Sequence, residues 1–249
     1  MMQLEPLKIV IPSYKRADRV LSKRLFERPI ICVCESEREE YERLNPECEI
    51  LTHPDSVRGL VAKRNWIADN IGDCFMIDDD VVSCHNISVP PSEKAYNLSN
   101  QEIYDTIQRL YRLAILLDVH LFGFSTKTRP CFYNEKSWYA LNIPITGCAY
   151  GIRQSKNIHW DTRFTLKEDF LISSTIMFRE RKILTCQALN FVQRDTGVNR
   201  GGLSEFRNKD EIKRNILLLR KFFGESIKKK PQRFKNEKES INVQISYKI

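Results

Sequence analysis

The sequence predicts an α/β domain with a mostly parallel sheet flanked by helices. In the first half of the chain, short apolar segments alternate with segments that carry helix signals, which favours parallel pairing with right-handed crossovers. The apolar segments are residues 7–11, 29–34, 48–52 and 74–77. The helical segments are residues 16–26, 36–44 (with Ser36 as N-cap) and 57–70. In such sheets, ligands bind beyond the carboxyl ends of the strands.

The second half of the chain mixes longer helices with isolated strands. The expected helices are residues 100–117, 167–181 and 209–223, and the expected strands are residues 119–125 and 183–188. Residues 145–152 form a glycine-containing segment that enters or leaves the sheet. We expect one domain over residues 1–226, followed by a basic C-terminal tail over residues 227–249.

Composition excludes several classes of protein. With 42% hydrophobic and 29% charged residues, the 249-residue chain has the composition of a folded domain rather than of a disordered chain. No run of 18 apolar residues is present and the N-terminus lacks a signal pattern, so we expect a cytoplasmic protein without a membrane partner. The eight cysteines form no CxxC pair, which predicts buried thiols rather than a zinc site. The formal charge of +8 permits nucleic acid or anionic nucleotides as partners.

Three consecutive aspartates follow the fourth apolar segment. Two carboxylates one residue apart can share a hard divalent cation such as Mn²⁺ or Mg²⁺, and this cation can bridge the phosphates of a nucleoside diphosphate. We expect Asp80 to be the direct metal ligand, and Asp78 to act through water or to contact a ribose. Asp79 is assigned to the same donor site. The alternative interpretation is an acidic turn after a strand.

Two further segments at strand ends suit an anionic nucleotide. After the first strand, Tyr14 can stack on a base and Arg16 can meet a phosphate, with Pro12 and Ser13 shaping the turn. Glu35, after the second strand, can accept a hydrogen bond from a ribose hydroxyl or a base edge. The alternative is an ordinary turn between a strand and a helix. No GxGxxG sequence is present here, which disfavours a nicotinamide-binding domain.

The third helical segment and a later glycine pair add basic candidates for the donor site. In the former, Arg58, Lys63 and Arg64 can reach a diphosphate, and Asn65 can orient a sugar or a base. The alternative is a basic amphipathic helix. In the latter, Arg200 stands beside Gly201 and Gly202 in a segment that suits a loop over an anionic ligand. A surface turn is the alternative there.

Glu168 and Asp169 open a predicted helix. One of them, with Asp169 preferred, can act as a general base that takes a proton from an acceptor hydroxyl. The helix dipole alone also favours acidic residues in a first turn, so a purely structural interpretation stays open. The helix follows the glycine-rich segment that contains Gly147, which we place on the acceptor side.

Taken in order, these motifs resemble a known family. The motifs are KIVIPSYKRADR, VRGLVAKRNWIADN, CFMIDDDV, LKEDF and GVNRGGLSEFR. Together they resemble the TET-associated glycosyltransferases, GT-A enzymes of the family 2 type that occur in phage genomes. The resemblance implies a GT-A sheet, a nucleotide-sugar donor such as a UDP-sugar, a divalent metal, and a hydroxylated pyrimidine in DNA as acceptor. Many GT-A enzymes supply a later histidine to the metal, but no histidine follows His159, which leaves water or Asp195 as the third ligand.

A DNA acceptor makes further residues candidates. A base turned out of the duplex can stack on Trp138, Tyr139 or Trp160, although each can equally be a packing residue. The basic residues Lys228, Lys229 and Lys230 can contact phosphates. Three alternatives stay open: a glycosyltransferase for a glycan, lipid or protein, a nucleotidyltransferase, and a non-catalytic nucleic-acid-binding module. A nucleotidyltransferase would normally carry a GxGxR loop where this chain has PSYKR.

Overall fold

The structure, a computed structural model, describes residues 5–127, 130–133, 137–154, 157–194, 208–229 and 243–246. The strands of its main sheet are β1 (Lys8–Pro12), β2 (Ile30–Cys34), β3 (Glu49–His53), β4 (Cys74–Ile77), β6 (Leu121–Phe124), β7 (Tyr139–Ala140), β8 (Ala149–Ile152) and β9 (Leu184–Cys186). The α-helices are α1 (Arg38–Leu44), α2 (Leu60–Ile71), α3 (Asn100–Leu116), α4 (Glu168–Glu180) and α5 (Lys209–Phe223).

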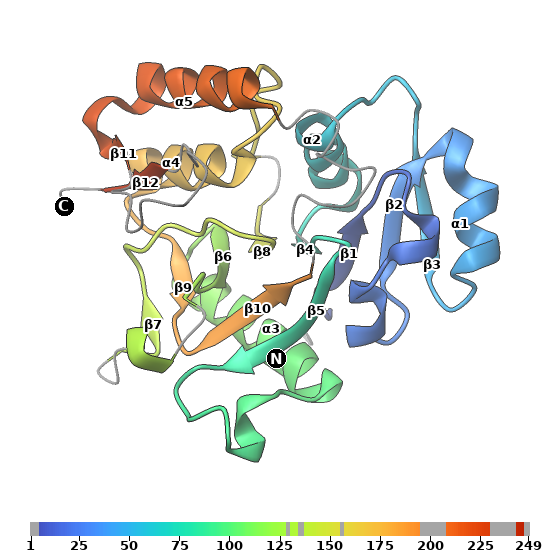
Figure 1. Cartoon of the computed structure of the whole chain (residues 1–249), viewed down its shortest axis with the longest axis horizontal. Helices are drawn as coiled ribbons and strands as arrows, with labels where there is room; N and C mark the ends of the chain where they lie inside the picture. The colour runs from blue at the N-terminus through green and yellow to red at the C-terminus, as the bar shows by residue number, and fades with distance from the viewer. Residues whose placement is uncertain are drawn as a thin grey trace.

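The main sheet has eight strands in the order β3-β2-β1-β4-β8-β6-β9-β7, with helices on both faces (Figure 1). Strands β3, β2, β1 and β4 are parallel, and so are β6 and β9. Strand β8 runs antiparallel between β4 and β6, and β7 runs antiparallel at the edge of the sheet beside β9. This arrangement confirms the predicted α/β class with a mostly parallel sheet, as expected for a GT-A domain.

Alternating side chains divide the core into two clusters, one on each face of the sheet. Along β4, Phe75 and Ile77 pack into a cluster with α1 and α3, while Cys74 and Met76 pack into a cluster with α2, α4 and α5. All four side chains have no exposed surface. The period of two in a pleated strand causes this division. Because both faces are covered, the central strands are apolar throughout, as the sequence predicted.

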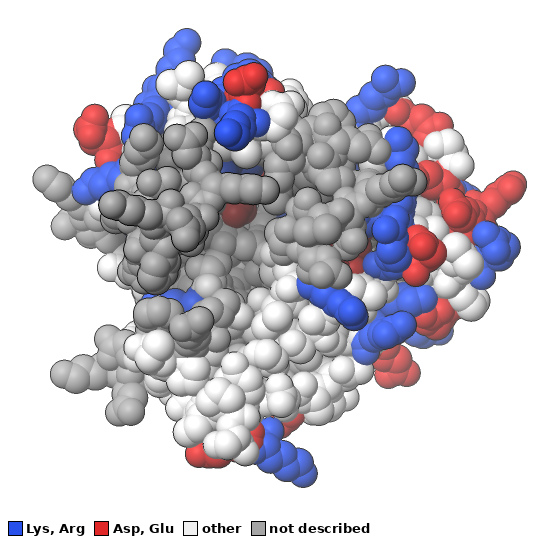
Figure 2. All heavy atoms as spheres, viewed as in Figure 1, with Lys and Arg blue, Asp and Glu red and all other residues white. Residues whose placement is uncertain are grey.

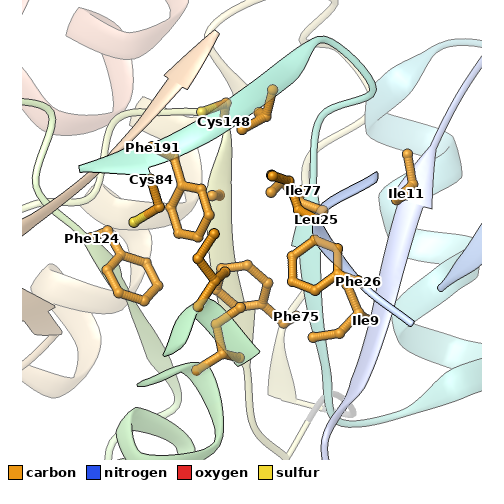
Figure 3. Packing of buried hydrophobic residues seen from close by; sticks show 14 of the residues in the cluster. Ile9, Ile11, Leu25, Phe26, Phe75, Ile77, Cys84, Phe124, Cys148 and Phe191 are labelled. Carbon is orange, nitrogen blue, oxygen red and sulfur yellow. The ribbon is translucent and has the colours of Figure 1, made fainter. Parts of the chain in front are cut away.

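A two-stranded antiparallel ribbon covers part of one face, and the sequence did not predict it. Its strands are β5 (Val81–Asn86) and β10 (Leu189–Gln193). The ribbon packs on the sheet through Phe191, whose ring lies near those of Phe124 and Phe75 (Figure 3). The distance between ring centres is 5.0 Å to Phe124, in an edge-to-face contact, and 6.1 Å to Phe75, in a tilted one. Aromatic pairs of this kind stabilise a core beyond the area that they bury. The ribbon therefore has a fixed position beside the carboxyl end of β4.

The antiparallel strand β8 begins where β4 ends. The Asp78 backbone N–H donates to the Cys148 carbonyl across 2.8 Å, so the segment before β8 lies against the aspartates. Gly151, within β8, faces the ring of Phe122 on β6, and a Cβ there would lie only 2.1 Å from a ring carbon. This close approach explains why the segment contains glycine.

Two local predictions in the first half were wrong. Residues 16–26 form two short 3-10 turns, Ala17–Arg19 and Ser22–Leu25, instead of one helix. The backbone N–H of Leu21 donates to the Asp79 carbonyl across 2.7 Å, so between the two turns this segment bonds to the aspartate turn instead of continuing as a helix. Ser36 does not cap α1, because the helix begins two residues later and the Ser36 hydroxyl donates to Asp55.

The C-terminal residues contain a second ribbon. Strand β11 (Ile227–Lys229) pairs antiparallel with β12 (Val243–Ile245), and Ile227 is buried against the cluster that contains α5. The domain boundary at residue 226 stays a prediction. Within the described ranges, no helix has the length and apolar character needed to cross a membrane.

Candidate functional site

The turn after β4 directs two of its three aspartates toward one point. The Gln193 amide nitrogen, at the end of β10, donates to Asp80 Oδ1 across 2.9 Å and to Asp78 Oδ2 across 3.3 Å. Asp78 and Asp80 are both half-buried. The two carboxylates predicted to bind a cation therefore share a single hydrogen-bond donor.

Both carboxylates are easier to protonate than an ordinary aspartate. Burial is the main cause that raises the pKa of Asp78, and the charges of Asp80 and Glu168 raise it further, against the opposing effect of Arg64. Burial also raises the pKa of Asp80, with a smaller contribution from the charge of Asp79, while the hydrogen bond from Gln193 lowers it. Concentrated negative charge of this kind is stabilised by a cation.

A hard divalent cation fits these donors. Carboxylate oxygens are the ligands that Mg²⁺ and Mn²⁺ prefer, and two of them converge here. Among the residues that the structure describes, no group of three or more His, Cys, Asp or Glu side chains can hold a metal ion. A cation at this site would therefore take its remaining ligands from water, from a bound diphosphate or from other oxygen atoms.

Asp79 points away from this site, which corrects its assignment to the donor. Its carboxylate accepts from the Ser13 hydroxyl and from the Arg16 guanidinium, each across 2.7 Å. Ser13 in turn contacts the buried Tyr41 hydroxyl at 2.8 Å. Asp79, Ser13 and Arg16 thus join the turn after β1 to the turn after β4, and they contact protein rather than an open surface.

Arg64 is also placed differently from the prediction. Its side chain is completely buried, and its guanidinium lies 3.0 Å from Asp78 and 3.5 Å from Glu168. The guanidinium carbon lies 4.8 Å from the centre of the Tyr150 ring, a cation–π contact. Arg64 therefore joins the aspartate turn to the start of α4 instead of reaching a diphosphate from the surface.

Glu168 and Asp169 occupy the first turn of α4, as predicted, but their environments differ. Glu168 is buried and faces Arg64. Asp169 is half-buried, and its Oδ1 accepts from the backbone N–H of Phe170 across 2.9 Å. Burial, followed by the neighbouring charge of Glu168, raises the pKa of Asp169. A carboxylate with a raised pKa is suited to take a proton near neutral pH.

Three other predicted side chains serve packing. The Lys63 ammonium is buried and donates to the Ser13 and Cys32 carbonyls at the ends of β1 and β2. The Asn65 amide exchanges two hydrogen bonds of 2.8 Å with the backbone of Trp160. Trp160 has no exposed surface and lies in the core, so it cannot stack on an acceptor base. The burial of Trp160 corrects its role in stacking, and the roles of Lys63 and Asn65 toward a ligand stay predictions.

The remaining donor candidates surround the carboxyl ends of β1 and β2. Pro12 is buried, Tyr14 is half-buried, and Glu35 and Arg58 are exposed. The Lys15 ammonium lies 4.9 Å from the centre of the Tyr14 ring, so this ring already contacts a cation. No contact in the structure tests whether these side chains bind a nucleotide.

The acceptor candidates do not form one group. Gly147 directly precedes Cys148 and so lies beside the aspartate turn. Trp138 is 48% exposed, next to the edge strand β7, which is four strands away from β4 or roughly 19 Å at ordinary strand spacing. Lys228 is exposed on β11, distant in sequence from the turn. The residues Asp195, Arg200, Gly201, Gly202 and Lys230 and the side chain of Lys229 lie outside the described residues.

The sequence analysis missed Gln193, Tyr41 and Tyr150. Gln193 carries the same signal as the aspartates, a polar residue at the end of an apolar segment, but the predicted strand ended at residue 188. Tyr41 and Tyr150 are completely or almost completely buried, and no sequence pattern separates them from ordinary core residues.

Comparisons with known proteins agree with the resemblance in the motifs. No curated protein matches the chain. The chain is similar to the solved structure described as "Crystal structure of S. aureus TarS 1-349", with 10% sequence identity and a TM-score of 0.48, over 86% of this chain and 64% of that one. The model of the family described as TET-Associated Glycosyltransferase matches residues 7–202, more than half of the chain. The chain therefore belongs to the TET-associated glycosyltransferase family.

Proposed function

We propose that this protein transfers a sugar from a nucleotide-sugar donor, such as a UDP-sugar, to a hydroxymethylated pyrimidine base in DNA, with a divalent cation. The observation that supports this most directly is the pair of carboxylates, Asp78 and Asp80, that converge on one atom at the carboxyl end of β4. Ligands of α/β sheets bind at this edge, and a nucleoside diphosphate needs a counter-charge to leave.

On the donor side, Asp80 holds Mn²⁺ or Mg²⁺ directly, and Asp78 assists while Arg64 keeps it in position. When bound, the cation neutralises the charge that develops on the diphosphate leaving group. Tyr14 and Glu35, at the ends of β1 and β2, bind the base and the ribose.

On the acceptor side, Asp169 takes the proton from the attacking hydroxyl. Its neighbour Glu168 faces the buried guanidinium of Arg64 across 3.5 Å, which makes Glu168 a positioning residue. The raised pKa of Asp169 favours proton uptake. If the product retains the configuration of the donor sugar, Asp169 instead stabilises positive charge on the sugar ring.

The DNA acceptor is supported by the family and by charge. The formal charge is +8. Exposed basic side chains, visible in Figure 2, gather over α5, among them Lys213, Arg220 and Lys221. A base inside a duplex has to be turned out to reach the donor sugar, at a cost of a few kcal/mol. Phosphate contacts make DNA binding fall with salt, with a log–log slope of about −0.9 per contact.

The experiment is a transfer assay with labelled nucleotide sugars and Mn²⁺. The acceptors are duplex DNA with 5-hydroxymethylpyrimidines, the same unmodified duplex, the free hydroxymethylated nucleotide, a glycan and a lipid alcohol. We expect transfer only to the modified DNA, lost on chelation of the metal and detected by mass spectrometry. Transfer to the glycan or lipid alone refutes the DNA acceptor, and transfer to the nucleotide alone moves the reaction to the precursor.

Variants in the same assay test which residue acts as the general base. Asp169→Asn is expected to lower the turnover by about 10²–10⁴-fold. Asp105→Asn, an exposed carboxylate on α3, is the matched control and should keep normal turnover. Normal turnover in Asp169→Asn would leave this residue only its structural role at the start of α4.

A further inference from the structure

We infer that Gln193 is the third protein ligand of the divalent cation, through the oxygen of its side-chain amide. The inference rests on the cation in the proposed function. Gln193 would supply the third ligand in a chain that has no histidine after His159. None of the motifs that indicate the donor site contains Gln193, so its role comes from the structure alone.

The first argument is the geometry of the amide. One atom, Nε2, lies within 2.9 Å of Asp80 and 3.3 Å of Asp78, so the amide occupies the point on which both carboxylates converge. A half-turn about the last side-chain bond exchanges the amide nitrogen with its oxygen. With the nitrogen forward, the amide donates to two carboxylates. With the oxygen forward, three oxygen atoms face the same point, and glutamine carbonyls are accepted ligands of hard cations.

The second argument is how the backbone presents this residue. In the pairing of β10 with β5, Gln193 lies opposite Val81, the residue that follows Asp80. Val192 lies opposite Ser83 and Gln193 lies opposite Val81, so the register skips Val82 of β5, an irregularity of the β-bulge kind directly after the aspartate turn. Bulges re-aim a side chain, and they are common beside active sites. The next backbone N–H, of Arg194, donates to the Asp80 carbonyl across 2.9 Å and fixes the strand end against the turn.

The third argument is the charge of the ligand set. Two carboxylates and a neutral amide carry a charge of about −2, which matches the cation and leaves coordination positions for the two phosphates of the donor. Such a set of ligands binds the cation weakly when no nucleotide is present, and more tightly when a nucleoside diphosphate is bound. Without the cation, the amide N–H groups donate to the carboxylates; with the cation, the amide oxygen would bind the same ion as the carboxylates.

The test uses the direction in which one substitution changes the affinity for Mn²⁺. Gln193→Glu keeps the shape and adds a charged oxygen, so a ligand role predicts Mn²⁺ binding that is tighter by about threefold or more, because affinity follows ligand charge. If Gln193 serves only as an N–H donor to the carboxylates, the same change repels Asp78 and Asp80 and weakens Mn²⁺ binding. Gln193→Leu removes the ligand atom, and we expect binding about tenfold weaker.

Free Mn²⁺ is measured by electron paramagnetic resonance during titration of the full chain, with and without UDP. Gln154→Glu, an exposed change of the same charge, is the matched control, and circular dichroism confirms folding of each variant. Weaker binding in Gln193→Glu, or unchanged binding in Gln193→Leu, overturns this inference while the wild type still binds Mn²⁺. A wild type that binds no Mn²⁺ even with UDP overturns the proposed cation itself.

Discussion

The three consecutive aspartates of the turn after β4 lie in two different environments. Asp79 lies between the Ser13 hydroxyl and the Arg16 guanidinium, and the exposed fractions of the Arg16 and Asp79 side chains are 12% and 7%. Asp78 and Asp80 share one amide donor, and Asp78 shares its guanidinium with Glu168. Local sequence cannot distinguish these residues, because the partners come from other elements.

The difference teaches how the fold separates structure from chemistry. A buried carboxylate with two donors of its own anchors neighbouring turns to each other. Carboxylates that share donors keep spare oxygen lone pairs; burial first, and then the charges of neighbouring carboxylates, raise the pKa values of Asp78 and Asp80. The repulsion between these charges disappears when a cation binds. The first environment predicts effects on stability, and the second predicts effects on activity.

The largest effect is expected for Asp80→Asn. It removes the proposed direct metal ligand, whose contribution of several kcal/mol corresponds to a turnover lower by about 10³-fold. The free energy of unfolding should stay equal or rise, because a repelled charge is lost. Steady-state assays with saturating donor and urea unfolding measure the two quantities. Unchanged Mn²⁺ binding in this variant would contradict the assignment.

The next largest effect is expected for Asp79→Asn, which should lower the stability of the fold and leave Mn²⁺ binding intact. It removes the carboxylate that Arg16 contacts, and breaking a buried ion pair lowers the free energy of unfolding by about 3 kcal/mol. Mn²⁺ binding should persist at temperatures where the variant is folded. Asp18→Asn is the control, because Asp18 is exposed and pairs with Arg19 at the surface. A variant as stable as wild type would remove the distinction between the two environments.

A smaller effect is expected for Arg64→Lys, at the boundary between the two environments. Lysine keeps the charge but loses the planar group that contacts Asp78, Glu168 and the ring of Tyr150 together. Losing one hydrogen bond to a charged group lowers the free energy of unfolding by about 2 kcal/mol. Urea unfolding measures this free energy, and Arg112→Lys on α3 is the control. No loss of stability would mean that the two carboxylates do not depend on the guanidinium.

The smallest effect concerns Glu211, a carboxylate outside the site with several donors. Hydrogen bonds from Arg214 first, then Thr165 and Asn215, lower the pKa of Glu211 to about 2. A lowered pKa stabilises the folded state above the pKa of the unfolded chain, and this contribution is lost as the pH falls from about 4 to about 2. Glu211→Gln should therefore cost on the order of 1 kcal/mol at pH 7, given its partial exposure. The difference from wild type should vanish near pH 2, as measured by urea unfolding.

The central strands and the aspartate turn were predictable because their signals are local. An apolar run such as residues 74–77, followed by charged residues, indicates a strand end whatever the rest of the chain does. Helix α5 was predicted with its observed bounds, since Asn208 caps it and Gly224 follows it. The order of the motifs then predicted the family, which the family match confirms.

The inward-facing polar residues were not predictable, for a physical reason. Lys63, Arg64 and Asn65 are buried in α2 together with apolar side chains, whereas the sequence analysis expected them to reach a ligand or to belong to a basic amphipathic helix. Burying such groups is favourable only when their partners are in place. The Arg64 and Asn65 partners, Glu168 and Trp160, lie 104 and 95 positions away along the chain. The β5–β10 ribbon was missed for the same reason, since its pairing is long-range.

The β5–β10 ribbon also sets when the site can exist during synthesis. Gln193 joins Asp80 from 113 positions further along the chain, so a nascent polypeptide carries the aspartates long before it carries the residue that completes their surroundings. A ribosome adds about 5–20 residues per second, which separates the two by several seconds. During that interval the turn after β4 has its charges but not the strand that holds them together. The pair of carboxylates is therefore assembled only after β10 has been made and has paired with β5.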